Sequence, residues 1–241
     1  MEYGTVSTAR YALLTGHLPP LDHLLVRRHI GLNDIRCTYL REVLHSLNDE
    51  PSFIRYGGCG PRTLHESWWH CNGFRHRGGD KPAYIYCSRG IYKRSQWYRH
   101  GVKHRDGDRP ATAKSRIHAE GWTTSPELKW FRYGRKHRDY ERPSQIHTCT
   151  GTMEWHTDNS ICRGGDKPAS ILKSVEACPR IEWYKDGRTH RDGGRPAILR
   201  GNPPQLTYAL NGYVMNAFQW RYSETETDVV CRTVTCLSSV L

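Results

Sequence analysis

The chain has 241 residues, enough for one large or two small domains, and a formal net charge of +12 at pH 7. Residues 51–200 hold 29 Lys and Arg against 15 Asp and Glu, whereas residues 1–50 and 201–241 each carry a net charge of −1. No apolar stretch approaches the roughly 20 residues of a membrane-spanning helix, which excludes an integral helical membrane protein.

Residues 1–50 have the spacing of short amphipathic helices. Apolar side chains recur at three- and four-residue steps, first from Leu21 onward and again from Ile35 to Leu47. Pro19 suits the start of the first helix, and Asn33 suits the N-cap of the second. The pattern predicts helices of about ten and fifteen residues in a small N-terminal module.

A phrase recurs five times in residues 51–213: Trp, Gly four positions later, then His-Arg, and Pro thirteen positions after the Trp. The copies begin 28, 33, 25 and 28 residues apart, a period typical of repeat architectures. The recurring residues are Trp69, His76, Arg77 and Pro82; Trp97, His104, Arg105 and Pro110; Trp130, His137, Arg138 and Pro143; Trp155, Arg163 and Pro168; and Trp183, His190, Arg191 and Pro196.

Residues on both sides of each turn alternate as in half-buried strands. Trp183 shares a face with Ile181, Ala197 shares one with Leu199, and Tyr98 falls on the face opposite to the tryptophans. Each copy therefore predicts a β-hairpin that buries its Trp. The fold class expected is mainly β: an antiparallel meander of β-hairpin repeats, as an open sheet or a solenoid, behind the helical module.

Partial copies are expected at both ends of the array. Phe53 to Gly57 is a candidate unit at the front, and Tyr208 to Gly212 keeps the Trp-to-Gly spacing without the later residues. Residues 214–241 are rich in β-branched side chains and predict a capping tail over the last strand. The domains expected are thus 1–50, 51–213 and 214–241.

The phrase resembles the MORN-repeat variant found in many proteins of large DNA viruses of amoebae, and in some bacteria and phages. The resemblance covers roughly residues 55–213. It departs where Asn159 replaces the Gly, Cys162 replaces the His and Ser144 replaces the Ala after Pro. The resemblance implies a repeat scaffold, often without known activity, in a viral setting.

The N-terminal module resembles an F-box more weakly, because the residues that close that motif are absent. A leading Leu-Pro is followed by apolar residues at similar spacing: Leu18, Pro19, Leu24, Ile30 and Ile35. By this resemblance, these five residues would dock a ubiquitin-ligase subunit while the repeats capture a substrate.

The repeated His-Arg pairs have two interpretations. They could form a ladder of cationic phosphate sites, or they could bond turn carbonyls and the acidic residue that follows, such as Asp80 after Arg77. The second, structural interpretation is favoured. Likewise, the Trp residues could stack on bases but are expected in the core. A zinc site was weighed and disfavoured, since no Cys-x-x-Cys occurs; its ligands would be His147, Cys149, His156 and Cys162.

We find no phosphate-binding loop, nucleophile elbow or kinase signature, so we expect no enzyme activity and no cofactor. The leading hypothesis is a noncatalytic scaffold for protein–protein interaction. The alternatives are the ligase adaptor and a basic protein that binds nucleic acid or an anionic surface. Nine cysteines without framework spacing, and no secretory signal, favour reduced thiols and a location in a virion or the host cytoplasm rather than secretion.

Overall fold

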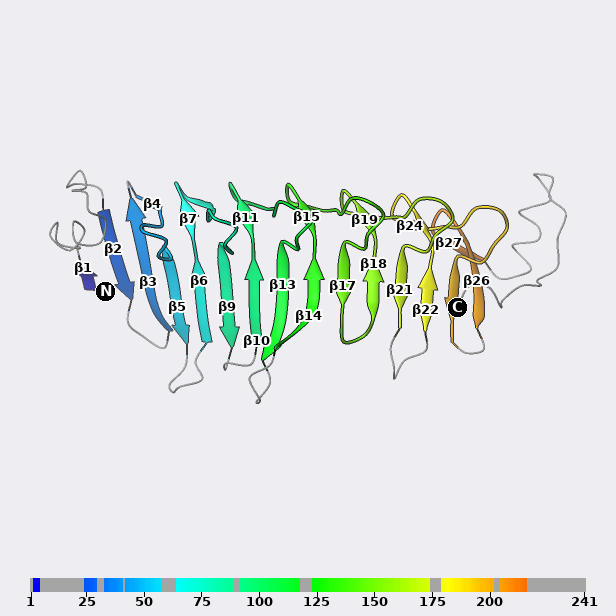
Figure 1. Cartoon of the computed structure of the whole chain (residues 1–241), viewed down its shortest axis with the longest axis horizontal. Helices are drawn as coiled ribbons and strands as arrows, with labels where there is room; N and C mark the ends of the chain where they lie inside the picture. The colour runs from blue at the N-terminus through cyan, green and yellow to red at the C-terminus, as the bar shows by residue number, and fades with distance from the viewer. Residues whose placement is uncertain are drawn as a thin grey trace.

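The computed structural model describes residues 2–4, 24–29, 33–40, 42–57, 64–88, 92–117, 123–173, 179–201 and 204–215. Every regular element within these ranges is a β-strand. Strands that follow one another along the chain pair antiparallel in one long sheet, which Figure 1 shows from the N-terminal end to the C-terminal end. The predicted antiparallel meander of hairpins is therefore confirmed.

The sheet is built from longer strands in chain order. They are β1 (Glu2–Gly4), β2 (Leu24–His29), β3 (Asn33–Leu40), β5 (Phe53–Gly57), β6 (Leu64–Trp68), β9 (Tyr84–Ser88), β10 (Tyr92–Gln96), β13 (Thr112–Ile117), β14 (Thr123–Lys129), β17 (Gln145–His147), β18 (Thr152–Glu154), β21 (Ser170–Leu172), β22 (Arg180–Glu182), β25 (Ile198–Arg200) and β26 (Gln205–Leu210).

Short hairpins lie along one long edge of this sheet, at the top of Figure 1. They are β7 (His70–Cys71) with β8 (Phe74–Arg75), β11 (Tyr98–Arg99) with β12 (Val102–Lys103), β15 (Phe131–Arg132) with β16 (Arg135–Lys136), β19 (His156–Thr157) with β20 (Ser160–Ile161), and β23 (Tyr184–Lys185) with β24 (Arg188–Thr189). The strands β4 (Val43–Leu44) and β27 (Tyr213–Met215) complete similar hairpins with β3 and β26.

Each of the five recurring Trp residues stands at the corner between a long strand and its short hairpin. The backbone N–H of Trp97 donates to the carbonyl of Ala111 at 2.9 Å, which adds one more rung to the β10–β13 ladder. The carbonyl of Trp97 then accepts from the N–H of His104 at 3.2 Å, which closes the short hairpin. A repeat unit is thus a long strand, a Trp corner, a short hairpin, a turn ending in Pro, and a second long strand.

The two faces of the sheet differ in chemistry. One row of paired positions crosses the sheet on one face, here called the aliphatic face, because most of its members are apolar and half-buried. Its members are Ile54, Ser67, Ile85, Ser95, Ala113, Leu128, Ile146, Met153, Ile171, Ile181, Leu199 and Leu206. The opposite face, here called the polar face, is partly covered by the short hairpins: the Tyr98 hydroxyl donates to Gln96 Oε1, and Tyr184 makes the same contact with Glu182.

The helices expected in the N-terminal module are not found where the structure describes it. Residues 24–29 and 33–40 are strands β2 and β3, which pair with each other and, through β3, with β5. No break in the sheet therefore separates residues 33–50 from the repeats. Residues 5–23, which include the start of the first expected helix, lie outside the described residues.

A further repeat unit lies at residues 38–52, where the sequence predicted a helix. The N–H of Thr38 donates to Ser52 O at 2.7 Å, and the N–H of His45 donates to Thr38 O at 3.1 Å, as Trp97 does with Ala111 and His104 does with Trp97. Thr38 therefore occupies the Trp position. Strand β4 folds back onto β3 and pairs Leu40 with Val43 and Tyr39 with Leu44, and this return produces the short apolar spacing that resembles a helix.

The two expected partial units have different outcomes. Phe53–Gly57 is the plain strand β5 between β3 and β6, so the prediction of a partial repeat there was wrong. At the other end, Tyr208 stands at the Trp position, and the turn at Asn211 and Gly212 joins β26 to β27. Of the expected capping tail, 214–241, the first two residues belong to β27, and residues 216–241 lie outside the described residues.

Candidate functional site

The arginine after each His joins its unit to the unit before it. Arg105 donates from Nε and Nη2 to the two carboxylate oxygens of Asp80, both at 2.8 Å, and Arg109 reaches the same carboxylate. The same Arg–Asp pairing between units, here called the joint, links Arg77 to Asp49, Arg138 to Asp108, and Arg191 to Asp166. The prediction that each arginine pairs with the acidic residue that follows it was wrong, because its carboxylate partner lies in the preceding turn.

The tryptophans complete this joint. The indole N–H of Trp130 donates to the backbone carbonyl of Asp108 at 3.0 Å, and the guanidinium of Arg138 lies 3.8 Å from the centre of the indole ring. Arg138 also donates to the carbonyl of Pro143, so one guanidinium fixes its own turn and the preceding one. Trp130 is buried, as are Trp69, Trp155 and Trp183, whereas Trp97 is half-buried.

The histidines join each unit to the unit after it. Nδ1 of His104 accepts from the backbone N–H of Tyr133, and its Nε2–H donates to Asp106 at 2.9 Å. His76 and His190 accept from the next hairpin in the same way, through the N–H of His100 and of Asn211. These rings therefore bridge successive hairpins, which supports the structural interpretation of the repeated histidines. His137 departs from the pattern, since its Nδ1 has no hydrogen-bond partner and lies 3.6 Å from Asp158.

Two departures from the phrase have local partners. Ser144, in place of Ala, lies 3.0 Å from Nδ1 of the buried His156, and Ser52 makes the same contact with the buried His70 at 2.8 Å. Asn159, in place of Gly, keeps the positive φ of that position and accepts from the N–H of Lys136 through its side-chain oxygen. Each change therefore adds a side-chain hydrogen bond to a neighbouring unit.

The fourth copy has an altered joint. Glu141, in the turn before it, stands where the first, second and fourth copies place Asp80, Asp108 and Asp166, and its carboxylate pairs with Lys167. Arg163 still stacks on Trp155 and donates to Pro168, but its buried Nε has no hydrogen-bond partner. Cys162, in place of His, forms no disulfide.

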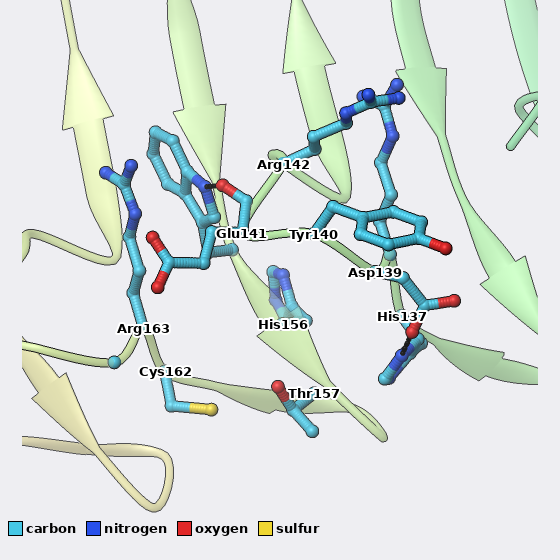
Figure 2. A pocket seen from close by; sticks show the side chains of 12 residues that line it. His137, Asp139, Tyr140, Glu141, Arg142, His156, Thr157, Cys162 and Arg163 are labelled. Carbon is cyan, nitrogen blue, oxygen red and sulfur yellow. Dashed lines mark hydrogen bonds and ion pairs between the residues drawn. The ribbon is translucent and has the colours of Figure 1, made fainter.

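Hollows lie between successive turns of the repeats. Figure 2 shows one of them, of about 230 Å³, with Tyr140 and Arg142 on one side, Arg163 and Cys162 on the other, and His156 between them. A second hollow, of about 250 Å³, is lined by Trp183 and its neighbours, which are the equivalent residues of the next unit. Because the hollow recurs with the repeat, it is a seam between units and not a unique site.

The residues weighed as zinc ligands are not brought together. His147 lies beside Gln145 and Glu127, while His156 contacts Ser144. Among the described residues no group of three metal-ligating side chains occurs. Nor does the part of the chain with described structure contain a helix long and apolar enough to cross a bilayer. Of the expected docking residues, Leu24 and Ile35 lie on β2 and β3, and Leu18, Pro19 and Ile30 fall outside the described residues.

Sequence reasoning did not find a cluster of cations on the polar face. Lys103 lies on the hairpin over this face, and burial together with the charges of Lys129, Arg94 and Arg75 lowers its pKa. The buried Glu127 is the carboxylate at one side of this cluster: burial raises its pKa, but hydrogen bonds from Lys114 and Lys129 outweigh that effect and lower the pKa to about 2. The available signal was the sixth residue after Trp, which is basic in the first three copies: Arg75, Lys103 and Lys136.

Comparison of the chain with family models, with curated proteins and with solved structures finds no match.

Proposed function

We propose that this protein is a noncatalytic repeat scaffold that binds a protein partner. The observation that carries the proposal is the joint between units, since the recurrent Trp, Arg and His side chains bond to the neighbouring repeats. The two hollows are equivalent seams between units, and neither presents a catalytic constellation of its own among the described residues. What the repeats offer to another molecule is a long regular surface.

The aliphatic face supports a protein as the partner. Its row of Ile, Leu and Met side chains crosses successive strands at one level and stays half-buried, and Leu206 is 41 % exposed. The cores of protein interfaces are depleted in charge and rich in apolar area, whereas nucleic acids are bound mainly through cations. A partner with an apolar segment therefore fits this face.

Charge placed in the aliphatic row tests the proposal. Affinity capture from host or viral lysate is done with the wild-type chain, with Ile171→Lys, and with the control Arg200→Ala, whose exposed residue lies on the polar face. Capture of the same protein by the wild type and the control, with loss in Ile171→Lys at unchanged circular dichroism, supports the proposal. Equal capture by all three contradicts it, as does turnover that one substitution abolishes while the fold is kept.

The sequence resemblance extends the proposal to a setting. We propose that the scaffold acts in a large DNA virus of amoebae, either in the particle or in the infected cell. Mass spectrometry of purified particles separates these two places, because a structural component is present at high copy number. Absence of the chain from both particles and infected cells would remove the viral assignment.

A further inference from the structure

A basic and aromatic platform occupies the polar face of strands β9, β10 and β13. The register pairs Tyr86 with Arg94 and Arg94 with Lys114, and it pairs Tyr92 with Arg116 one row further on. Since alternate residues share a face, these five side chains lie on the face that carries Gln96 and the hairpin. Here they are called the platform.

The adjacent hairpins add two cations to the platform. Arg75 donates to the Tyr98 hydroxyl at 3.2 Å, and Lys103 pairs with Tyr98 across the β11–β12 hairpin. The Tyr98 hydroxyl in turn donates to Gln96, which holds this hairpin over the platform strands. Arg75 and Lys103 therefore lie near Arg94 and extend the positive charge of the platform.

Three of the cations in and beside the platform have no carboxylate partner within the described part of the protein. Arg75, Arg94 and Lys103 form no ion pair with a carboxylate there, whereas Lys114 and Lys129 share Glu127. Holding several like charges together costs free energy, and an anionic ligand removes that cost. The platform is thus suited to a chain of negative charges.

The exposed aromatic side chain of the platform favours single-stranded nucleic acid over other polyanions. Tyr92 is 53 % exposed, and the Arg116 guanidinium lies 5.9 Å from its ring centre. Unpaired bases stack on exposed aromatic rings next to cations that hold the phosphates. A duplex keeps its bases stacked inside, and an acidic peptide offers carboxylates without planar rings, so neither uses Tyr92.

The platform is confined to one part of the array. In the last two full units, the sixth residue after Trp is Ile161 or Thr189 in place of a cation. On the same face, Arg180 is paired with Glu182. Arg200 remains exposed there, in the same row as Arg94 but without the surrounding cluster, and it provides a matched control.

We propose that a single-stranded nucleic acid binds across this platform, with Arg94, Lys103 and Arg116 on its phosphates and Tyr92 under a base. This site lies on the face opposite to the aliphatic row, so it does not depend on the proposed protein partner. A substitution can therefore abolish binding at one surface and leave binding at the other intact.

Fluorescence anisotropy of the full chain tests the site with a labelled single strand of about 15 nucleotides, as DNA and as RNA. The expected result is binding that weakens steeply from about 50 to 200 mM salt. Arg94→Ala combined with Lys103→Gln should weaken binding at least fivefold and reduce the logarithmic salt slope by about 1.4, since each phosphate contact in a single strand contributes roughly 0.7. Arg200→Ala should bind as the wild type does.

Tyr92→Ala separates stacking from charge. It should weaken binding about 5- to 150-fold and leave the salt slope unchanged, because one stacked base contributes roughly 1–3 kcal/mol. Circular dichroism checks that each variant is folded. The proposal is overturned if the oligonucleotide does not bind, if Arg94→Ala/Lys103→Gln binds no more weakly than Arg200→Ala, or if polyglutamate, duplex or phosphatidylserine vesicles bind as tightly without any effect of Tyr92→Ala.

Discussion

Arg138 donates two hydrogen bonds to the carboxylate of Asp108 in the preceding unit, from Nε to Oδ1 at 2.7 Å and from Nη2 to Oδ2 at 3.0 Å. Hydrogen bonds from Arg138 hold the pKa of Asp108 below its usual value. The same carboxylate also pairs with Arg142. One aspartate therefore fixes the distance between two turns that are about thirty residues apart in the chain.

Removing this carboxylate should loosen the array. Asp108→Ala should lower the free energy of unfolding by about 1.5–3 kcal/mol, the usual range for a hydrogen bond to a charged group that loses its partner. Asp106→Ala is the control: Asp106 is 71 % exposed and bonds only within its own unit, so it should cost less than about 1 kcal/mol. Urea denaturation measures both, and equal losses would show that the joint adds nothing.

Buried aromatic residues should dominate the stability of each unit. Trp183→Ala should cost about 3–5 kcal/mol, and Tyr98→Ala about 3 kcal/mol or more, because both side chains are 7 % exposed. From its place on the face opposite to the tryptophans, the sequence predicts that Tyr98→Ala costs much less than Trp183→Ala. The structure contradicts the basis of that prediction, because the short hairpin turns Tyr98 onto Gln96 and away from water. Tyr92→Ala, at 53 % exposure, is the control and should stay within about 0.5 kcal/mol. Thermal melts that show equal losses of stability in Tyr92→Ala and Tyr98→Ala would contradict this prediction.

Glycine is required at the hairpin turn of the second unit. Gly101 has a φ of +84°, and a Cβ there would lie 3.2 Å from Cδ1 of Phe74 in the preceding hairpin. Gly101→Ala should therefore lower stability by about 1–2 kcal/mol, the cost of a left-handed conformation for a residue with a side chain. Gly78→Ala meets no atom within 4 Å and should cost much less. The two melting temperatures decide the matter, and a neutral Gly101→Ala would refute the close contact.

Acid should destabilise the fold through two buried histidines. Burial is the largest cause that lowers the pKa of His70 and of His156 to about 4, below the ordinary 6.5. The folded state therefore binds fewer protons than the unfolded state, and stability is fully present above pH 6.5 and declines as the pH falls toward 4. Each histidine should contribute a loss on the order of 3 kcal/mol over this range.

The matched measurement is the free energy of unfolding between pH 7 and 4.5 in the wild type and in His156→Gln. The variant should show the shallower dependence, since one titrating group is gone. Parallel curves would mean that His156 titrates normally in the folded protein.

The repeat register allowed the hairpins and the meander to be predicted from sequence. Trp, Gly and Pro at fixed spacing indicate a strand, a turn with positive φ and the start of the next strand, and all three are local requirements. The partner of Arg138 could not be predicted in the same way. Its own turn and the preceding turn both contain an acidic residue, and only the spacing of neighbouring units selects Asp108.

The unit at residues 38–52 was missed because its most recognisable positions differ. Thr38 replaces the Trp and Glu42 replaces the Gly, although Glu42 adopts the same positive φ of 64°. His45, Asp49 and Pro51 keep their places relative to Thr38 and were the signal available. The cation cluster was missed for a different reason: Arg75 and Arg94 both come near Lys103 only when the hairpin folds over the sheet.

Because each guanidinium reaches back by a single unit, every joint involves nearest neighbours alone. Excising the module from Trp97 to Lys129 would leave two new ends with complementary chemistry, Asp80 on one and Arg138 on the other. The length of such a ribbon is thus free to change by whole steps during evolution, without redesign of what remains.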